Sequence, residues 1–164
     1  PVLLHAFKRL AEADPGRQLV LIARPKAGGD TEALIERLGL IDHIRFVADA
    51  SHEEINRLYA ESAAAVVPSL YEGFGLPAVE AMAAGIPLVS SDGGALAEVV
   101  ADGGLLVPAG DSDALAETLE RVLTDPALAT RLGEQGRERV ERHFCWSVCA
   151  QQMVAQYRAC IDAC

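Results

Sequence analysis

Two carboxylates, Glu72 and Glu80, enclose a short run of glycine, proline and apolar residues, 73-GFGLPAV-79. An ionised carboxylate accepts hydrogen bonds from neighbouring hydroxyl groups, such as those of a sugar or a ribose. Glycines let a ligand approach the backbone, and a helix that starts at Pro77 would present free N–H groups to an anion. This spacing fits a ligand with phosphate between two sets of hydroxyls, such as a sugar–diphosphate–nucleoside.

The same residues also fit a plain turn between a strand and a helix. Glycine and proline shape such turns, and acidic residues are favoured near the start of a helix. The spacing alone therefore leaves a turn and a binding site open as alternatives, and the surrounding elements have to be considered.

Apolar periodicity predicts strands that alternate with helices along the whole chain. The predicted strands are 18–23, 43–48, 63–68, 87–91 and 104–108. The predicted helices are 2–13, 31–40, 52–62, 77–84, 94–100, 112–124, 127–142 and 145–162. This alternation is typical of an α/β fold with a Rossmann-like parallel sheet and helices on both faces. Ligands of such sheets bind beyond the carboxyl ends of the strands, where residues 69–77 lie.

Composition narrows the class of protein. The chain has 164 residues, is 51% hydrophobic and carries a net charge of −10. One packed domain is expected, and the acidic charge argues against non-specific nucleic-acid binding. No apolar run approaches the roughly 18 residues of a membrane span, and no signal-peptide pattern is present. Because the chain starts at Pro1 inside a predicted helix, we expect it to be an N-terminally truncated piece without its first strand.

The stretch 72-EGFGLPAVE-80 resembles the two-glutamate signature of retaining glycosyltransferases of the GT-B fold, especially glycosyltransferase family 4 (group 1). The likeness continues through 43-HIRFVA-48, 63-AAAVVPSLYEGFGLPAVEAMAAGIPLVSSDGG-94, 98-EVV-100, 104-GLLVPAGDSDALAETL-119 and 143-HFCW-146. It covers nearly the whole chain. The resemblance implies that residues 1–164 form the C-terminal, donor-binding domain of such an enzyme, and that the N-terminal acceptor domain is missing.

In that family the second glutamate binds the nucleotide ribose, which implies this role for Glu80. The first glutamate contacts the hydroxyls of the donor sugar, so Glu72 is the predicted residue of the catalytic centre. It would position the substrate rather than act as a nucleophile. The resemblance also implies that the backbone of Phe74, Gly75 and Leu76 lies against the sugar and diphosphate.

Other parts of the family's donor site correspond less clearly to this chain. The base is expected near Ala48 to Ala50. The Arg and Lys that hold the diphosphate follow the first strand of the family's domain, which lies upstream of Pro1. Arg24 and Lys26 follow the strand at 18–23 and are candidates for a phosphate contact, although a solvated loop also explains them. We therefore expect the chain by itself to be inactive.

The implied activity is transfer of a sugar from a nucleotide-diphosphate donor, such as GDP-mannose or UDP-glucose, to an acceptor, with retention of configuration. No cofactor or metal is expected. The implied partners are the donor and the missing domain, and that domain would also allow peripheral membrane association of an otherwise cytoplasmic protein. Two hypotheses from other classes are a non-catalytic nucleotide-binding or assembly module and a sugar-nucleotide epimerase.

Three other features of the sequence are candidates for a binding or catalytic site. Asp111-Ser112-Asp113 has the Asp-x-Asp form that binds Mn²⁺ in a different glycosyltransferase fold, but it opens a predicted helix, where Asp111 or Ser112 is expected to be the N-cap. The four histidines lack ligand spacing, so neither zinc nor a His-based triad is supported. Asp92-Gly93-Gly94 follows a strand and either borders the donor pocket or forms an ordinary turn.

Four cysteines, Cys145, Cys149, Cys160 and Cys164, share one arc of the last predicted helix. They span about 28 Å, which is too far for one metal ion. They are interpreted as a stripe of small apolar side chains on a buried or interface face, with contact to the missing domain as one hypothesis.

Overall fold

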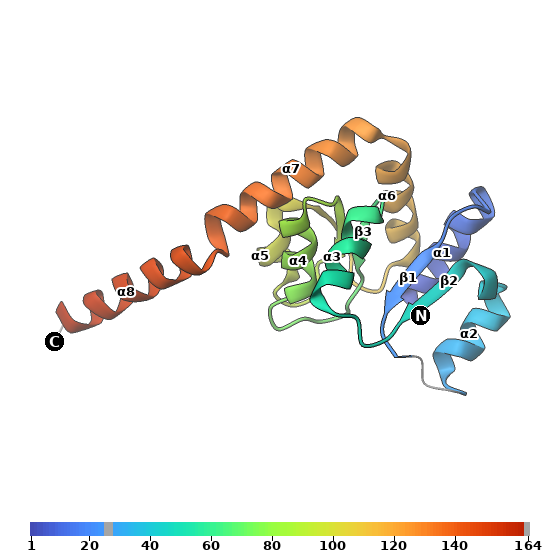
Figure 1. Ribbon diagram of the computed structural model, residues 1–164, viewed down its shortest axis with the longest axis horizontal. Coiled ribbons are helices and arrows are strands. Elements are labelled where there is room, and N and C mark those ends of the chain that lie inside the picture. The colour runs from blue at the N-terminus through green and yellow to red at the C-terminus, as the bar shows by residue number, and fades with distance from the viewer. Residues whose placement is uncertain (25–27, 163–164) are drawn as a thin grey trace.

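The computed structural model describes residues 1–24 and 28–162, in which parallel strands alternate with helices (Figure 1). The strands are β1 (Leu19–Ile22), β2 (Ile44–Val47), β3 (Ala65–Val67), β4 (Leu88–Ser91) and β5 (Leu105–Val107). The α-helices are α1 (Val2–Ala13), α2 (Asp30–Leu38), α3 (His52–Glu61), α4 (Leu76–Ala84), α5 (Leu96–Val100), α6 (Ser112–Thr124), α7 (Pro126–His143) and α8 (Trp146–Asp162). The predicted order of elements is confirmed, and two short 3₁₀ turns, η1 (Ile41–His43) and η2 (Ala101–Gly103), were not predicted.

Local capping explains why several helices begin and end where they do. Ser51 accepts a hydrogen bond from the N–H of Glu54 at 3.2 Å and so caps α3. Asp111 accepts from the N–H groups of Asp113 and Ala114 and caps α6. The predicted N-cap is thereby confirmed, and it accounts for the Asp-x-Asp motif without a ligand. Gly85 adopts the left-handed conformation that ends α4.

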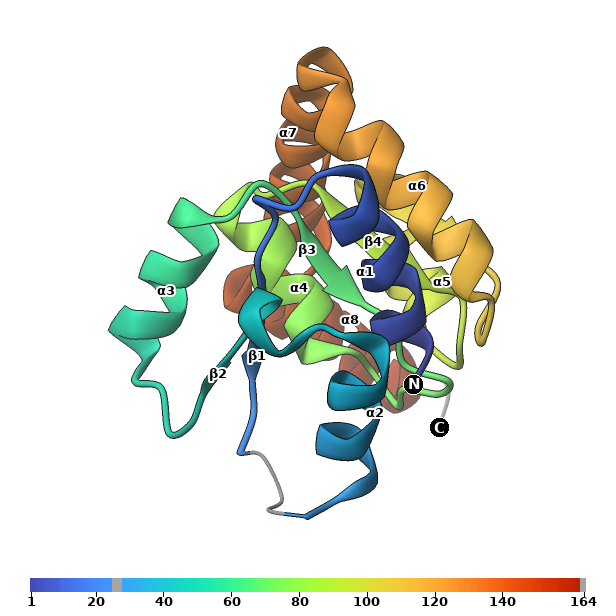
Figure 2. The same cartoon turned by 90° about the vertical axis from the view of Figure 1, so that its right-hand side faces the viewer.

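The strands form two parallel sheets instead of the single sheet that the alternation predicts. One sheet pairs β1 with β2, and the other has the order β3-β4-β5. Figure 2 shows β1 beside β2, and β3 beside β4. In the doubly wound order 3-2-1-4-5-6 the first strand lies between the second and the fourth. If β1 to β5 are strands two to six of that order, the break falls where the first strand belongs. The parallel pairing is as predicted, and the absence of the first strand stays a prediction.

Helices cover both faces of the strands, as predicted. Successive strand residues point to opposite faces. Val66 and Val89 contribute to a core with α1, α2 and α6, whereas Val67 and Leu88 contribute to a second core with α4 and α5. The strands are therefore held between two apolar layers, and their carboxyl ends and the following loops are left at one edge.

The last helix, α8, extends away from the rest of the chain (Figure 1). None of its described residues is buried, and the side chain of Trp146 is 91% exposed. Cys145 and Cys149 are half-buried and Cys160 is exposed, while Cys164 lies outside the described residues. The cysteines therefore do not form a stripe in the core of this chain, and their contact with another domain stays a prediction.

The helices were also compared with the requirements of a membrane span. Among residues 1–24 and 28–162, no helix is both long enough and apolar enough to cross a membrane.

Candidate functional site

The loop between β3 and α4, residues 68–75, carries the predicted donor-binding residues and depends on one glycine. Gly75 is the N-cap of α4 with φ of 92°, and a Cβ there would lie 2.6 Å from the side chain of Leu96. Any other residue at this position would thus have a strained backbone conformation, and its Cβ would clash with Leu96. The helix begins at Leu76, so Pro77 is its second residue, whereas the sequence predicted that it would be the first. Its missing N–H still costs nothing, because the first turn lacks intrahelical acceptors.

The first turn of α4 leaves backbone donors free for an anion. The N–H groups of Ala78 and Val79 donate to the carbonyl of Gly75, at 2.9 and 3.3 Å. The N–H groups of Gly75 and Leu76 donate no hydrogen bond within the described part of the chain. They lie at the positive end of the helix dipole. The geometry is therefore compatible with the predicted phosphate contact.

Glu72 is half-buried and is held through both its backbone and its side chain. Its backbone forms an isolated parallel bridge with Gly94, and its carbonyl accepts the N–H of Ala95 at 2.9 Å. Its carboxylate atom Oε1 accepts the hydroxyl of Ser69 at 2.8 Å. Glu72 is therefore fixed at the carboxyl edge of the β3-β4-β5 sheet, where a ligand of such a sheet binds.

The turn after β4, residues 92–95, packs directly on the β3–α4 loop. A Cβ at Gly93 would lie 2.4 Å from the carbonyl oxygen of Leu70, and a Cβ at Gly94 would lie 2.4 Å from that of Glu72. Only glycine permits so close an approach. Asp92 accepts the N–H of Ala109 at 2.8 Å and so ties this turn to the loop after β5. Sequence reasoning considered a pocket border or an ordinary turn here and missed this support of Glu72.

Glu80 is exposed on α4, next to a tyrosine that the sequence did not single out. Tyr59 of α3 is half-buried, and its hydroxyl donates to the carbonyl of Pro77 at 3.5 Å. Burial raises the pKa of Tyr59, and the negative charge of Glu80 raises it further. The hydroxyl therefore stays protonated near neutral pH and remains a hydrogen-bond donor beside Glu80. No local pattern links the two residues, because they belong to different helices.

The two apolar residues of the predicted site differ in what they contact. The Phe74 ring meets the ring of Phe144 edge to face, with centroids 5.7 Å apart and an interplanar angle of 85°. Phe144 lies between α7 and α8, and its ring also has the guanidinium of Arg139 at 5.8 Å. Leu76 is exposed. The side chain of Phe74 is thus engaged by the end of α7, which leaves its backbone for the predicted ligand contact.

The predicted base region lies at the carboxyl ends of β1 and β2. Asp49, within the predicted stretch Ala48 to Ala50, has φ of 54°, and its carboxylate accepts two hydrogen bonds from Arg24, at 3.0 and 2.6 Å. Arg24 is therefore paired with a carboxylate in this structure. Lys26, the other candidate for a phosphate contact, lies outside the described residues.

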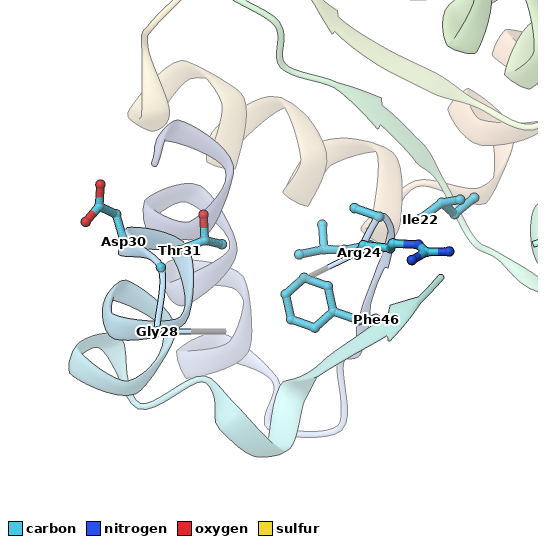
Figure 3. Close-up of a pocket in the computed structure, with 9 residues that line it drawn as sticks. Ile22, Arg24, Gly28, Asp30, Thr31 and Phe46 are labelled. Atoms are coloured by element: carbon cyan, nitrogen blue, oxygen red, sulfur yellow. The ribbon is translucent and has the colours of Figure 1, made fainter. Parts of the chain in front are cut away.

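A shallow hollow lies beside Arg24, between the end of β1 and the start of α2 (Figure 3). Its lining includes the ring of Phe46, the side chain of Ile22, and Asp30 and Thr31 of α2. It shares no residue with the loop that carries Glu72 or with α4. The candidate site is therefore the β3–α4 loop with the start of α4, and this hollow is a separate feature of the same edge.

No cluster that suits a metal ion accompanies the site. Among residues 1–24 and 28–162, no group of three or more His, Cys, Asp or Glu side chains is arranged to hold one. The absence of a metal requirement stays a prediction.

Known proteins resemble this chain along most of its length. Residues 1–139 match the family model described as glycosyl transferases group 1. The chain belongs to this family. Its architecture is that of the C-terminal domains of GT-B glycosyltransferases, as predicted, while membership of family 4 stays a prediction. The match ends at Arg139, so the last turn of α7 and all of α8 lie beyond it.

Among its relatives, an "MMP alpha-(1->4)-mannosyltransferase" of Mycolicibacterium hassiacum is 46% identical over 97% of this chain and 39% of its own length. Among solved structures, a sucrose-phosphate synthase of Thermosynechococcus elongatus is 37% identical with a TM-score of 0.83, over 99% of this chain and 43% of that one. An Anabaena protein solved in complex with UDP is 25% identical with a TM-score of 0.84, over 96% and 44%. This chain spans about two-fifths of the length of these relatives.

Proposed function

We propose that this chain is the donor-binding domain of a retaining glycosyltransferase, and that it binds a nucleotide-diphosphate sugar. The observation that carries the proposal is the pair Glu72 and Glu80 on either side of the start of α4, where the N–H groups of Gly75 and Leu76 donate no hydrogen bond within the described residues. The pair is matched to its two roles by the resemblance of 72-EGFGLPAVE-80 to the family signature.

The proposed roles follow the chemistry of the donor. Glu80 accepts hydrogen bonds from the ribose hydroxyls, and Glu72 accepts them from the donor sugar. The diphosphate lies between them, against the N–H groups of Gly75 and Leu76 and the positive end of the α4 dipole. The base lies near Ala48 to Ala50.

In the proposed reaction the bond between the anomeric carbon and the diphosphate oxygen breaks, and its electron pair leaves with the nucleotide. The acceptor hydroxyl oxygen bonds to the anomeric carbon on the same face, and its proton passes to the departing diphosphate oxygen. The negative charge that develops on the diphosphate is stabilised by the N–H groups at 75–76, which are already oriented before the reaction. The Arg and Lys implied upstream of Pro1 would add to this, and no metal ion is required.

The relatives support this proposal at the level of substrate class. One is named a mannosyltransferase, and another was solved with UDP. GDP-mannose and UDP-glucose are therefore the first donors to test. The remaining part of the full-length protein would supply the acceptor site, and the 164-residue chain alone is expected to show no transfer.

The test is calorimetric titration of the full-length protein with GDP-mannose, UDP-glucose, GDP and UDP. We expect one donor and its nucleotide to bind. Glu80→Ala should weaken that binding roughly 10- to 100-fold, because it removes charge-assisted hydrogen bonds to the ribose. The matched control is Glu141→Ala, an exposed glutamate of α7 outside the site, which should leave the affinity unchanged.

The proposal would be refuted if none of the four ligands bound. It would also be refuted if Glu80→Ala left the affinity for the bound ligand unchanged. Product analysis distinguishes the two alternative hypotheses. An epimerase would convert the donor without an acceptor, and a non-catalytic module would bind the donor but transfer nothing. Transfer that persists in EDTA would support the absence of a metal requirement.

A further inference from the structure

Two serine hydroxyls connect the end of β4 to the carboxylate of Glu72. Ser91, the last residue of β4, is buried and donates its hydroxyl hydrogen bond to the carbonyl of Ser69. Ser69 donates its own hydroxyl to Oε1 of Glu72 at 2.8 Å. The neighbouring Ser90 is also buried, but its hydroxyl bonds to the carbonyls of Val67 and Ser91 within the strands. Of the two serines of β4, Ser91 is thus the one whose hydroxyl bonds to the β3–α4 loop.

These hydrogen bonds act on a residue whose backbone is already fixed. Glu72 is bridged to Gly94, and its carbonyl accepts the N–H of Ala95. With the backbone held on one side, the orientation of the carboxylate depends on its side-chain torsions. The Ser69 hydroxyl is the one group of the described residues that hydrogen-bonds to this carboxylate, and it engages Oε1 only. Oε2 is therefore the carboxylate oxygen that remains to accept a hydrogen bond from a ligand.

Glu80 shows that such support is not a general property of the site. It is exposed on α4, and no hydrogen bond to its carboxylate occurs within residues 1–24 and 28–162. An unrestrained glutamate loses side-chain entropy when a ligand fixes it, whereas a restrained one has lost that entropy before binding. The two carboxylates thus differ in how well they are prepared for a ligand.

We propose that Ser69 is a positioning residue for Glu72: its hydroxyl holds Oε1 so that Oε2 faces the hydroxyls of the donor sugar. Ser91 supports it by fixing the backbone of Ser69. This inference rests on the proposed donor-binding function for its activity readout. The inference gives a functional role to Ser69, which lies outside the glutamate signature at 72–80.

The main experiment is a double-mutant cycle in the full-length protein with Ser69→Ala, Glu72→Ala and the combined variant. We expect Ser69→Ala to raise the donor dissociation constant about 10-fold, because a hydrogen bond to a charged group is lost. In the Glu72→Ala background the same change should have almost no effect, since the group it positions is gone. Independent, additive effects of the two substitutions would overturn the proposal.

Two further variants separate positioning from a purely structural role. Ser69→Thr keeps the hydroxyl and should restore affinity to within about 3-fold of the parent protein. Ser62→Ala is the matched control, because the hydroxyl of Ser62 bonds only to the carbonyl of Leu58 in its own helix. Thermal unfolding of each variant is measured alongside. If affinity falls only in step with the unfolding temperature, or Thr fails to restore it in a folded protein, Ser69 has no positioning role.

A second measurement does not depend on donor binding. Crystal structures of the full-length protein should show one Glu72 rotamer in the parent and in Ser69→Thr, and several in Ser69→Ala. Failure of all nucleotides to bind would reject the proposed function, and the rotamers would still decide the positioning role. A single, unchanged Glu72 rotamer in Ser69→Ala would reject the latter.

Discussion

At the scale of single residues, the two glutamates of the candidate site differ in whether neighbouring residues hold them in place. Glu72 is half-buried and bound by Ser69, Gly94 and Ala95, whereas Glu80 is exposed beside Tyr59. A fixed group suits the atoms near the reacting bond, where small errors in geometry are costly. A mobile group is sufficient for the ribose, which lies farther from the reaction. The difference matches the roles proposed for them.

The two glycines Gly94 and Gly73 provide a matched test of this support. At Gly94 a Cβ would lie 2.4 Å from the Glu72 carbonyl oxygen, and φ is 65°. At Gly73 a Cβ would meet nothing within 4 Å. In urea unfolding of this chain, Gly94→Ala should lower the free energy of unfolding by about 1–3 kcal/mol, and Gly73→Ala should change it by less than about 0.5 kcal/mol. Equal effects of the two substitutions would contradict the close contact between the turn and the loop.

At the scale of elements, an aromatic contact joins the β3–α4 loop to the end of α7. Phe74 and Phe144 meet edge to face, and Arg139 stacks near the second ring while its guanidinium donates to the carbonyls of Glu98 and Val99. The loop, the end of α5 and the α7–α8 junction are therefore coupled in one cluster. This cluster borders the candidate site, because Phe74 lies two residues from Glu72.

The energy of this contact can be measured by a second cycle. Phe74→Leu and Phe144→Leu keep an apolar side chain and remove the ring pair. Urea unfolding of the single and double variants should give a coupling energy of about 0.5–1.5 kcal/mol, the range found for edge-to-face pairs. Single effects that add to within about 0.3 kcal/mol would show that the rings do not stabilise each other.

At the scale of the whole molecule, the main feature is that the strands form two separate sheets. In the described residues β1 pairs only with β2, and β3 pairs only with β4, so each has one side without a strand partner. Backbone groups on such a side are a template for another strand. We predict that a strand preceding α1 in the full-length protein takes that place, as the first strand does in the order 3-2-1-4-5-6.

Hydrogen exchange can test this assignment. A longer chain that includes residues upstream of Pro1 should protect the amides of β1 and β3 at least 10-fold more than the 164-residue chain does, because a pairing strand suppresses their local opening. The far-edge strand β5 pairs with β4 in both chains and serves as the internal control. Protection of β1 and β3 that does not change with chain length would mean that no strand joins the sheets.

The amino-acid sequence by itself determined the order and type of the elements and the two glutamates of the site. The N-cap at Asp111 depends on hydrogen bonds to residues a few positions away, so a local pattern predicted it. The signature identified Glu72 and Glu80 through resemblance, although their spacing alone fitted a simple turn as well. The parallel alternation likewise predicted that residues 69–77, which include Glu72, would lie near the carboxyl edge of a sheet.

Only the tertiary structure decided how these glutamates are held. Ser91 lies 22 residues from Ser69, and Phe144 lies 70 residues from Phe74, so no periodicity links either pair. The split of the strands into two sheets also follows from strand order in space. Contacts of this kind are made between elements that the chain brings together only when it packs, and the residues that position Glu72 therefore became visible only in the folded molecule.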